Sequence, residues 1–178
     1  MVSYPDREIA PGVRVLADST FPLYLIEGER PLLVDTAISA YAAPLLAALA
    51  RVLPGQKLAT IVLTHSHYDH TGALTALEGS TGAEVLASQR TCEVLRSPRA
   101  LALINQLNRE FAEKLGGAAA PAVAPPARLR AIAEGDEIPL DGDRCLRVFE
   151  TPGHTRCSVS YLLQPGGVLF IGDAAGVV

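Results

Sequence analysis

Short apolar runs separated by polar turns divide the chain into predicted strands and helices. β-Branched and apolar residues dominate residues 13–16, 22–27, 31–35 and 58–63, which predicts buried strands. Alanine and leucine dominate residues 41–52, which predicts a helix among these strands. This combination of helices and strands is typical of a layered α/β fold.

A longer helix is predicted in the middle of the chain, where Pro98 occupies a helix start. Its apolar residues recur three or four positions apart and form one stripe that could cover the core or a site. They are Leu101, Ile104, Leu107, Phe111 and Leu115. The Pro/Ala/Gly-rich residues 116–127 that follow cannot be helical throughout, which predicts an extended or flexible loop.

A second set of strands is predicted after Arg128, including residues 145–150 and 168–171. Residues 158–178 are nearly all apolar, so we expect inner strands that need a covering layer. The remaining sequence provides no such layer. We therefore expect that a C-terminal part of the fold is missing from this chain.

Composition predicts one soluble domain over residues 1–178, because 49% hydrophobic and 19% charged residues are ordinary globular values. A net charge of −4 without a basic stripe argues against a nucleic-acid partner. No apolar run approaches the roughly 20 residues of a membrane span, and residues 1–8 show no export segment. Three cysteines without a C-x-x-C pair fit a reducing compartment, so we expect a cytoplasmic protein without a membrane partner.

The densest candidate chemistry is the run HSHYDH at residues 65–70, which holds three of the four histidines. Neutral imidazole and carboxylate are ligands that suit zinc, iron or manganese. Alternate side chains of extended backbone point to opposite sides, so His65 and His67 share one side. The following turn brings Asp69 and His70 toward a second position, and one segment could therefore serve two adjacent metal ions.

Two further candidates follow later strands. His154 lies in a Pro-Gly turn after residues 145–150, and Asp173 follows Gly172 after residues 168–171. Alone, each is more typical of an ordinary loop or turn residue. Cys157, three positions after His154, is a candidate for either a small core residue or a further ligand.

These motifs, taken together and in order, resemble those of the metallo-β-lactamase-fold superfamily of binuclear metallohydrolases. The resemblance rests on THSHYDHTG at residues 64–72, TPGHT at 151–155, and Gly172-Asp173. Val34-Asp35-Thr36 resembles the first motif of that family, whose Asp is usually structural. The implied fold is a four-layer αβ/βα sandwich, here lacking its C-terminal part.

The resemblance also implies a ligand set for two divalent ions, with zinc expected first and iron or manganese as alternatives. His65, His67 and His154 would bind the first ion, Asp69 and His70 the second, and Asp173 would bridge both. The family supplies a last histidine from a downstream loop, whereas this chain has no histidine after His154. Activity of the chain alone is therefore an open question at this stage.

The expected reaction is hydrolysis of an activated carbonyl, in a thioester or lactone, by a metal-bound hydroxide that Asp69 orients. No glycine-rich phosphate loop is present, which favours small ester-like substrates over phosphate esters. Residues 85–93 and 105–109 are similar to a stretch of the quinolone-signal response thioesterases that act on 2-aminobenzoylacetyl-coenzyme A, which favours thioesters. We expect a small-molecule partner, and a homodimer stays an alternative to a monomer.

Two other classes of function and two roles for the insert remain open. The first class is an iron oxidoreductase on the same fold, either a persulfide dioxygenase with one iron or a flavin-linked di-iron reductase, which typically has Glu in place of His67. The second class is a catalytically impaired binding module. Residues 99–127 are interpreted either as a lid or acyl-pocket wall, or as a plain packing helix and linker.

Overall fold

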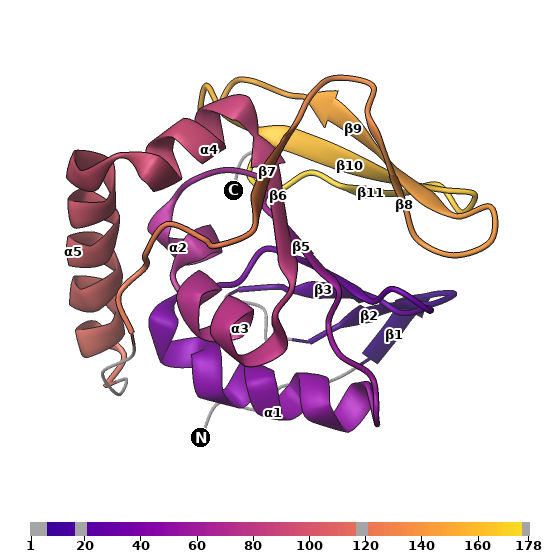
Figure 1. The fold of residues 1–178 in the computed structure, drawn as a ribbon, viewed down its shortest axis with the longest axis horizontal. Coiled ribbons are helices and arrows are strands. Elements are labelled where there is room, and N and C mark those ends of the chain that lie inside the picture. The colour runs from indigo at the N-terminus through magenta and orange to yellow at the C-terminus, as the bar shows by residue number, and fades with distance from the viewer. Residues whose placement is uncertain (1–6, 17–20, 117–120, 176–178) are drawn as a thin grey trace.

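The computed structural model describes residues 7–16, 21–116 and 121–175. Seven strands form its first sheet (Figure 1). Their order in the sheet is their order in the chain, β1 to β7. The strands are β1 (Arg7–Ala10), β2 (Val13–Val15), β3 (Tyr24–Ile26), β4 (Leu32–Val34), β5 (Thr60–Val62), β6 (Glu84–Ser88) and β7 (Leu129–Ile132). β1 to β4 pair antiparallel, whereas β4 to β7 pair parallel. The parallel half brings several strand ends to one edge.

Four antiparallel strands form the second sheet, in the order β11-β10-β9-β8. They are β8 (Glu137–Pro139), β9 (Cys145–Glu150), β10 (Val159–Gln164) and β11 (Val168–Phe170). Alternate residues of β10 face the interior, as expected for a strand with one buried face: Val159, Tyr161 and Leu163 are at most 2% exposed. Figure 1 shows this sheet on the side of the first sheet that lies away from α1 and α3.

Helices fill the connections between the strands of the first sheet. They are the 3₁₀ turn η1 (Ser39–Tyr41), α1 (Ala42–Val52), α2 (Tyr68–Thr71), α3 (Leu74–Thr81), α4 (Gln89–Arg96) and α5 (Pro98–Lys114). The starts of α4 and α5 follow from the sequence, because Ser88 and Ser97 cap them by accepting backbone N–H groups. Pro98 then occupies the first turn of α5, where a missing N–H costs nothing.

Two apolar cores hold the layers together. One lies between the first sheet and its helices, and includes Leu45 of α1 and Leu74 of α3. The other lies between the two sheets and includes Val62 and Tyr161. Within the described ranges no helix follows the second sheet, so this part of the chain forms three layers of the expected four-layer sandwich.

Two predictions about elements need correction. β7, expected to belong to a second set of strands, instead extends the first sheet parallel to β6. The predicted stripe of α5 is also rotated, because Leu107 is 37% exposed whereas Asn108 is buried, and Leu115, 50% exposed, lies beyond the helix end at Lys114. At 100° per residue, position 108 lies closer to the direction of Leu101 and Ile104 than position 107 does.

Part of the Pro/Ala-rich loop, residues 117–120, lies outside the described residues, and residues 121–126 have no regular secondary structure. In the part of the chain that the structure describes, no helix combines the length and apolarity required to span a membrane.

Candidate metal centre

Parallel strands of the first sheet bring the first candidate residues to one edge. β4 and β5 are parallel neighbours, so their carboxyl ends lie together, with Asp35 directly after β4 and His65 shortly after β5. The backbone of His67 is extended (φ −67°, ψ 152°), and α2 begins at the next residue. The chain therefore turns at this edge and carries His70 back toward Asp35, whose carboxylate lies 2.9 Å from Nδ1 of His70.

The second sheet brings the remaining candidates to the same place. His154 lies in the turn between β9 and β10, and Asp173 follows β11. Nε2 of His154 is 3.1 Å from Nδ1 of His67 and 3.3 Å from the Asp173 carboxylate. The Asp173 carboxylate is also 3.4 Å from Nε2 of His70. Face-to-face packing of the sheets thus joins residues that lie about 100 positions apart in the chain.

The side chains form two donor groups that share one histidine. The first group consists of His65, His67 and His154, and the second of His65, His70 and Asp173. Within each group the donor atoms lie within 4.8 Å of one another. Three nitrogens, or two nitrogens and an oxygen, are donor sets that suit divalent transition metals.

The hydrogen bonds of His65 test whether a cation fits this cluster. The hydroxyl of Thr64 donates its proton to Asp35, so its oxygen accepts from Nδ1 of His65 at 3.1 Å. Nε2 of His65 is then the unprotonated nitrogen, and it is buried without a hydrogen-bond partner. Burial and the nearby His70 lower the pKa of His65 to about 3, which keeps the ring neutral. A metal ion bound at this nitrogen would pair the buried lone pair, which lies where the two donor groups meet.

Asp35 and Thr64 hold the histidines of the cluster in place by hydrogen bonds. The backbone N–H and the hydroxyl of Thr64 each donate to the Asp35 carboxylate at 2.8 Å. The same carboxylate contacts Nδ1 of His70, which leaves Nε2 of His70 directed at Asp173. A hydrogen bond at one ring nitrogen fixes the orientation of an imidazole whose other nitrogen binds a metal ion.

Charges around His70 and Asp173 favour an ionised carboxylate at this corner. Burial alone would lower the pKa of His70, but the carboxylates of Asp35 and Asp173 raise it to about 10. The hydrogen bond from His70 lowers the pKa of Asp173 to about 2, against the opposing effect of burial. Asp173 therefore presents a charged oxygen to the donor group.

Gly172 allows Asp173 to approach the first sheet. The residue has a φ of +52°, a conformation that favours glycine. A Cβ atom at this position would lie 2.7 Å from the Thr64 hydroxyl oxygen, closer than such atoms approach in proteins. Glycine at position 172 is thus required by the close approach of this turn to Thr64.

Asp69 and Cys157 lie beside the cluster but outside both donor groups. A carboxylate oxygen of Asp69 is 3.9 Å from Nε2 of His70. Asp69 also lines a hollow of about 460 Å³ whose walls include Phe21 and Leu169. The thiol of Cys157 contacts the hydroxyls of Ser66 and Thr155 at 3.4 and 3.2 Å. These hydrogen bonds outweigh burial and lower the pKa of the Cys157 thiol.

Sequence reasoning assigned no site role to Thr64 and Asn108. Thr64 was visible only as the first residue of the histidine motif, and its contacts depend on β4 and β5 being neighbours. Asn108 accepts a hydrogen bond from the Ser39 backbone and donates one to the Gly72 carbonyl. A polar residue beside a predicted apolar helix stripe was the one signal that could have indicated it.

Comparison with known proteins gives a consistent result. A family described as the Metallo-beta-lactamase superfamily matches residues 22–178. The chain is 34% identical over 132 residues to a hydroxyacylglutathione hydrolase of Rhodopseudomonas palustris, covering 74% of the chain and 39% of that protein. It is 31% identical over 160 residues to the acyl-coenzyme A thioesterase MBLAC2 of Gallus gallus, covering 85% of the chain and 56% of that protein.

Solved structures agree on the fold. The metallo-beta-lactamase GOB-18 from Elizabethkingia meningoseptica superposes with a TM-score of 0.70 at 23% identity. The superposition covers 91% of this chain and 56% of the other. The chain therefore spans about half the length of the relatives that it matches.

Proposed function

The chain belongs to the Metallo-beta-lactamase superfamily, and from this premise we propose that it forms the metal-binding part of a hydrolase that cleaves an activated carbonyl, with thioesters as the first substrate class and lactones as the second. The observation that carries the proposal is the buried, unpartnered Nε2 of His65 at the corner shared by both donor groups. The similarity to a hydroxyacylglutathione hydrolase and an acyl-coenzyme A thioesterase supports the choice of thioesters.

The proposed ligands are drawn from the two donor groups, except that His65 is assigned to the first ion alone and Asp69, which lies beside the second group, is added to the second ion. His65, His67 and His154 would hold one divalent ion, and Asp69, His70 and Asp173 the other. Separations of 3.3 Å from His154 and 3.4 Å from His70 support a bridging role for Asp173. Zinc suits these donors best, with iron or manganese as alternatives. When bound, divalent cations act as Lewis acids that polarise a carbonyl and lower the pKa of water toward about 7.

The protein's own side chains would orient the reactants. Asp69 lies at the edge of the cluster and is the proposed catalytic residue, accepting a hydrogen bond from the attacking water and directing its lone pair at the carbonyl carbon. Asp35 would hold His70 in place through its hydrogen bond to Nδ1. The proton bound by Asp69 would then be available to the leaving thiol.

The acyl part of the substrate would occupy the hollow of about 460 Å³ beside the cluster. Asp69, His70 and Asp173 contribute to its polar lining, and aromatic and aliphatic side chains to the rest. Phe21 belongs to this wall, and its ring packs edge-on against Phe111 of α5 at 5.9 Å between centroids. This contact favours the interpretation that residues 99–127 hold a pocket wall in place. Pockets with apolar walls and a few polar groups are typical of small-molecule sites.

Metal analysis combined with a substrate panel tests this function. We expect two equivalents of divalent metal per chain, and hydrolysis of acyl-glutathione or acyl-coenzyme A thioesters that stops in Asp69→Asn. Loss of turnover with both metal equivalents retained would support the role of Asp69 in orientation, and loss of one equivalent would support its role as a ligand. A metal-loaded protein that hydrolyses no thioester or lactone would contradict the proposal. Oxygen consumption with a persulfide substrate and one bound iron would instead indicate the dioxygenase alternative.

A further inference from the structure

Helix α5 makes one buried polar contact with the rest of the molecule that packing alone does not explain. Asn108 is 3% exposed and lies on the helix face that also buries Leu101, Ile104 and Ala112. Its Oδ1 accepts the backbone N–H of Ser39 at 2.9 Å, and its Nδ2 donates to the Gly72 carbonyl at 3.4 Å. Burying an amide side chain costs free energy unless its own donor and acceptor atoms are paired, so an apolar residue would serve simple packing better.

The two backbone groups that Asn108 joins belong to the two segments behind the candidate metal centre. Ser39 follows residues 35–38, which begin with the Asp35 that holds His70. Gly72 directly follows α2, the helix that carries His70. α5 contacts both η1 and α2, and stands beside α2 in Figure 1.

Three further hydrogen bonds already join these segments nearer to the cluster. The backbone N–H and the hydroxyl of Thr36 both donate to the His70 carbonyl at 2.9 Å. The N–H of Ala73 donates to the Ala37 carbonyl at 3.1 Å. Asn108 adds a contact to the same junction, because Ser39 lies two residues after Ala37 and Gly72 directly precedes Ala73.

Close packing and unusual backbone angles indicate that the junction needs such a clamp. A Cβ atom at Gly72 would lie 2.6 Å from Oδ1 of Asn108 and 2.7 Å from Cα of Ile38, so glycine alone allows this approach. Asp35 and Ala37 have φ angles of 61° and 60°, in the left-handed region that non-glycine residues rarely adopt. Surrounding contacts must hold such a segment in place.

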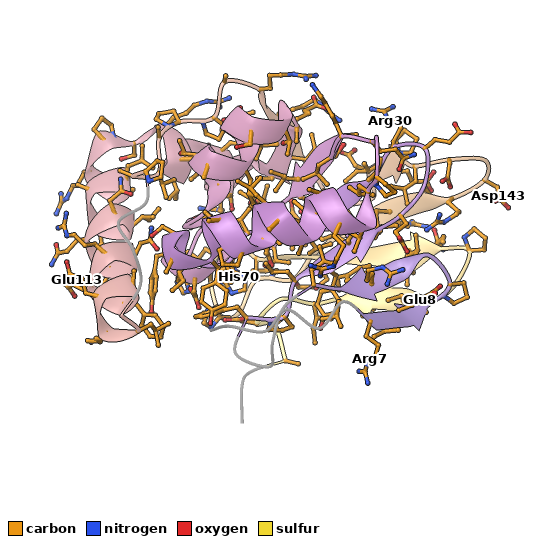
Figure 2. The ribbon with its side chains drawn as sticks, turned by 90° about the horizontal axis from the view of Figure 1, so that it is seen from below. Arg7, Glu8, Arg30, His70, Glu113 and Asp143 are labelled. Carbon is orange, nitrogen blue, oxygen red and sulfur yellow. The ribbon has the colours of Figure 1, made fainter. Side chains whose placement is uncertain are left out.

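We propose that Asn108 is a positioning residue for the metal centre: through it, helix α5 locks α2 against residues 35–39 and thereby fixes His70 relative to Asp35 and Asp173. The insert would then be a structural part of the centre as well as a neighbour of the substrate. In Figure 2, His70 of α2 lies on the inner side of α5, whereas Glu113 of α5 lies on the outer side of that helix. The link to metal binding rests on the proposed function, but the clamp itself does not.

Helix α5 offers a matched control for the test. Asn105 lies one turn earlier and also makes two backbone hydrogen bonds, to the N–H and the carbonyl of Val123, at 2.7 and 2.9 Å. Asn105→Ala therefore removes two side chain–backbone hydrogen bonds from α5 and should loosen only the loop after this helix. Asn108→Ala removes two such bonds from the junction of α2 and residues 35–39.

Hydrogen exchange of the metal-free protein separates the two variants. In Asn108→Ala we expect the amides of Thr36 and Ala73 to exchange at least about tenfold faster than in the natural chain. The variant lacks contacts that keep the junction closed, so the junction opens more often. In Asn105→Ala these two amides should keep their rates, while the Val123 amide exchanges faster. Unchanged Thr36 and Ala73 rates in Asn108→Ala, or equal acceleration in both variants, would overturn the proposal.

Metal titration provides a second readout that does not depend on hydrolysis. Second-sphere changes typically weaken metal binding about 10- to 100-fold, so Asn108→Ala should weaken the binding event that involves His70 by about tenfold, and Asn105→Ala should not. Asn108→Asp keeps the acceptor for Ser39 and should fall between; it replaces Asn108→Ala if that variant does not fold. A natural chain with the expected exchange pattern but no thioesterase activity would reject the proposed function and leave the clamp intact.

Discussion

At the scale of single residues, His65 is the centre of the candidate site. Its side chain is 1% exposed, Thr64 occupies its Nδ1, and its Nε2 has no partner within the described residues. Leaving a buried polar atom unpaired costs about 1–3 kcal/mol. A cation bound at Nε2 would offset that cost. His65 has one unprotonated nitrogen and can bind one ion, so its loss should affect the same ion as the loss of His67.

Alanine substitutions at these two histidines test that assignment. His65→Ala and His67→Ala should each reduce the bound metal from two equivalents per chain to about one, because a three-donor group loses most of its affinity with one donor. Elemental analysis after dialysis measures both. Ser66→Ala, between the two ligands in the chain, should keep the natural stoichiometry. Two equivalents of bound metal in either alanine variant would contradict the assignment of both histidines to the first ion.

At the scale of elements, α2 shows how little local stability a functional helix can have. It is four residues long, too short to be stable by itself, and has no side-chain cap at its start. Its position depends on contacts with residues 35–39 and with α5, above all where Gly72 meets Asn108. The element that carries His70 is therefore held by tertiary packing.

Two glycine substitutions should change stability in opposite directions. Gly72→Ala forces a methyl group against Asn108 and Ile38, and we expect it to lower the free energy of unfolding by about 1–3 kcal/mol. Gly79→Ala, in α3, meets no atom within 4 Å and should raise it by about 0.5–1 kcal/mol, because alanine favours helix. Urea denaturation of both variants measures the difference. A Gly72→Ala protein as stable as the natural chain would show that the junction is loosely packed.

At the scale of the whole molecule, the candidate centre joins the two sheets. His65, His67 and His70 come from the first sheet and its connections, whereas His154 and Asp173 come from the second. Apart from the apolar core, the hydroxyl of Tyr161 in β10 also joins the sheets by donating to the Leu63 carbonyl at 2.7 Å. Bound metal would add a further link across the interface of the two sheets.

Metal binding should therefore stabilise the folded chain as a unit. At a free zinc concentration 100 times the Kd, each site adds about 2.7 kcal/mol to the free energy of unfolding. We expect a chelator to lower the midpoint of thermal denaturation, and His154→Ala to reduce the difference between metal-loaded and chelated protein. Differential scanning calorimetry measures both. A midpoint that does not respond to metal or chelator would contradict a metal centre between the sheets.

The local pattern of the sequence indicated six of the eleven strands that the structure describes, together with the helices α1 and α5. β-Branched apolar runs indicated β2, β3, β4, β5, β9 and β11, because a strand buried in a sandwich must carry such residues. Pro98 fixed the start of α5. The histidine motif and the Gly-Asp pair identified the residues that meet at the edge of the sheets, because metal ligands must be specific residue types at specific strand ends.

Only the tertiary structure decided which residues share a group and what holds them. It made His65 common to both groups, left Asp69 outside them, and joined β7 to the first sheet. It also buried Asn108 between α2 and η1. These features depend on contacts between segments far apart in the chain, and local propensity carries no information about which segments will meet.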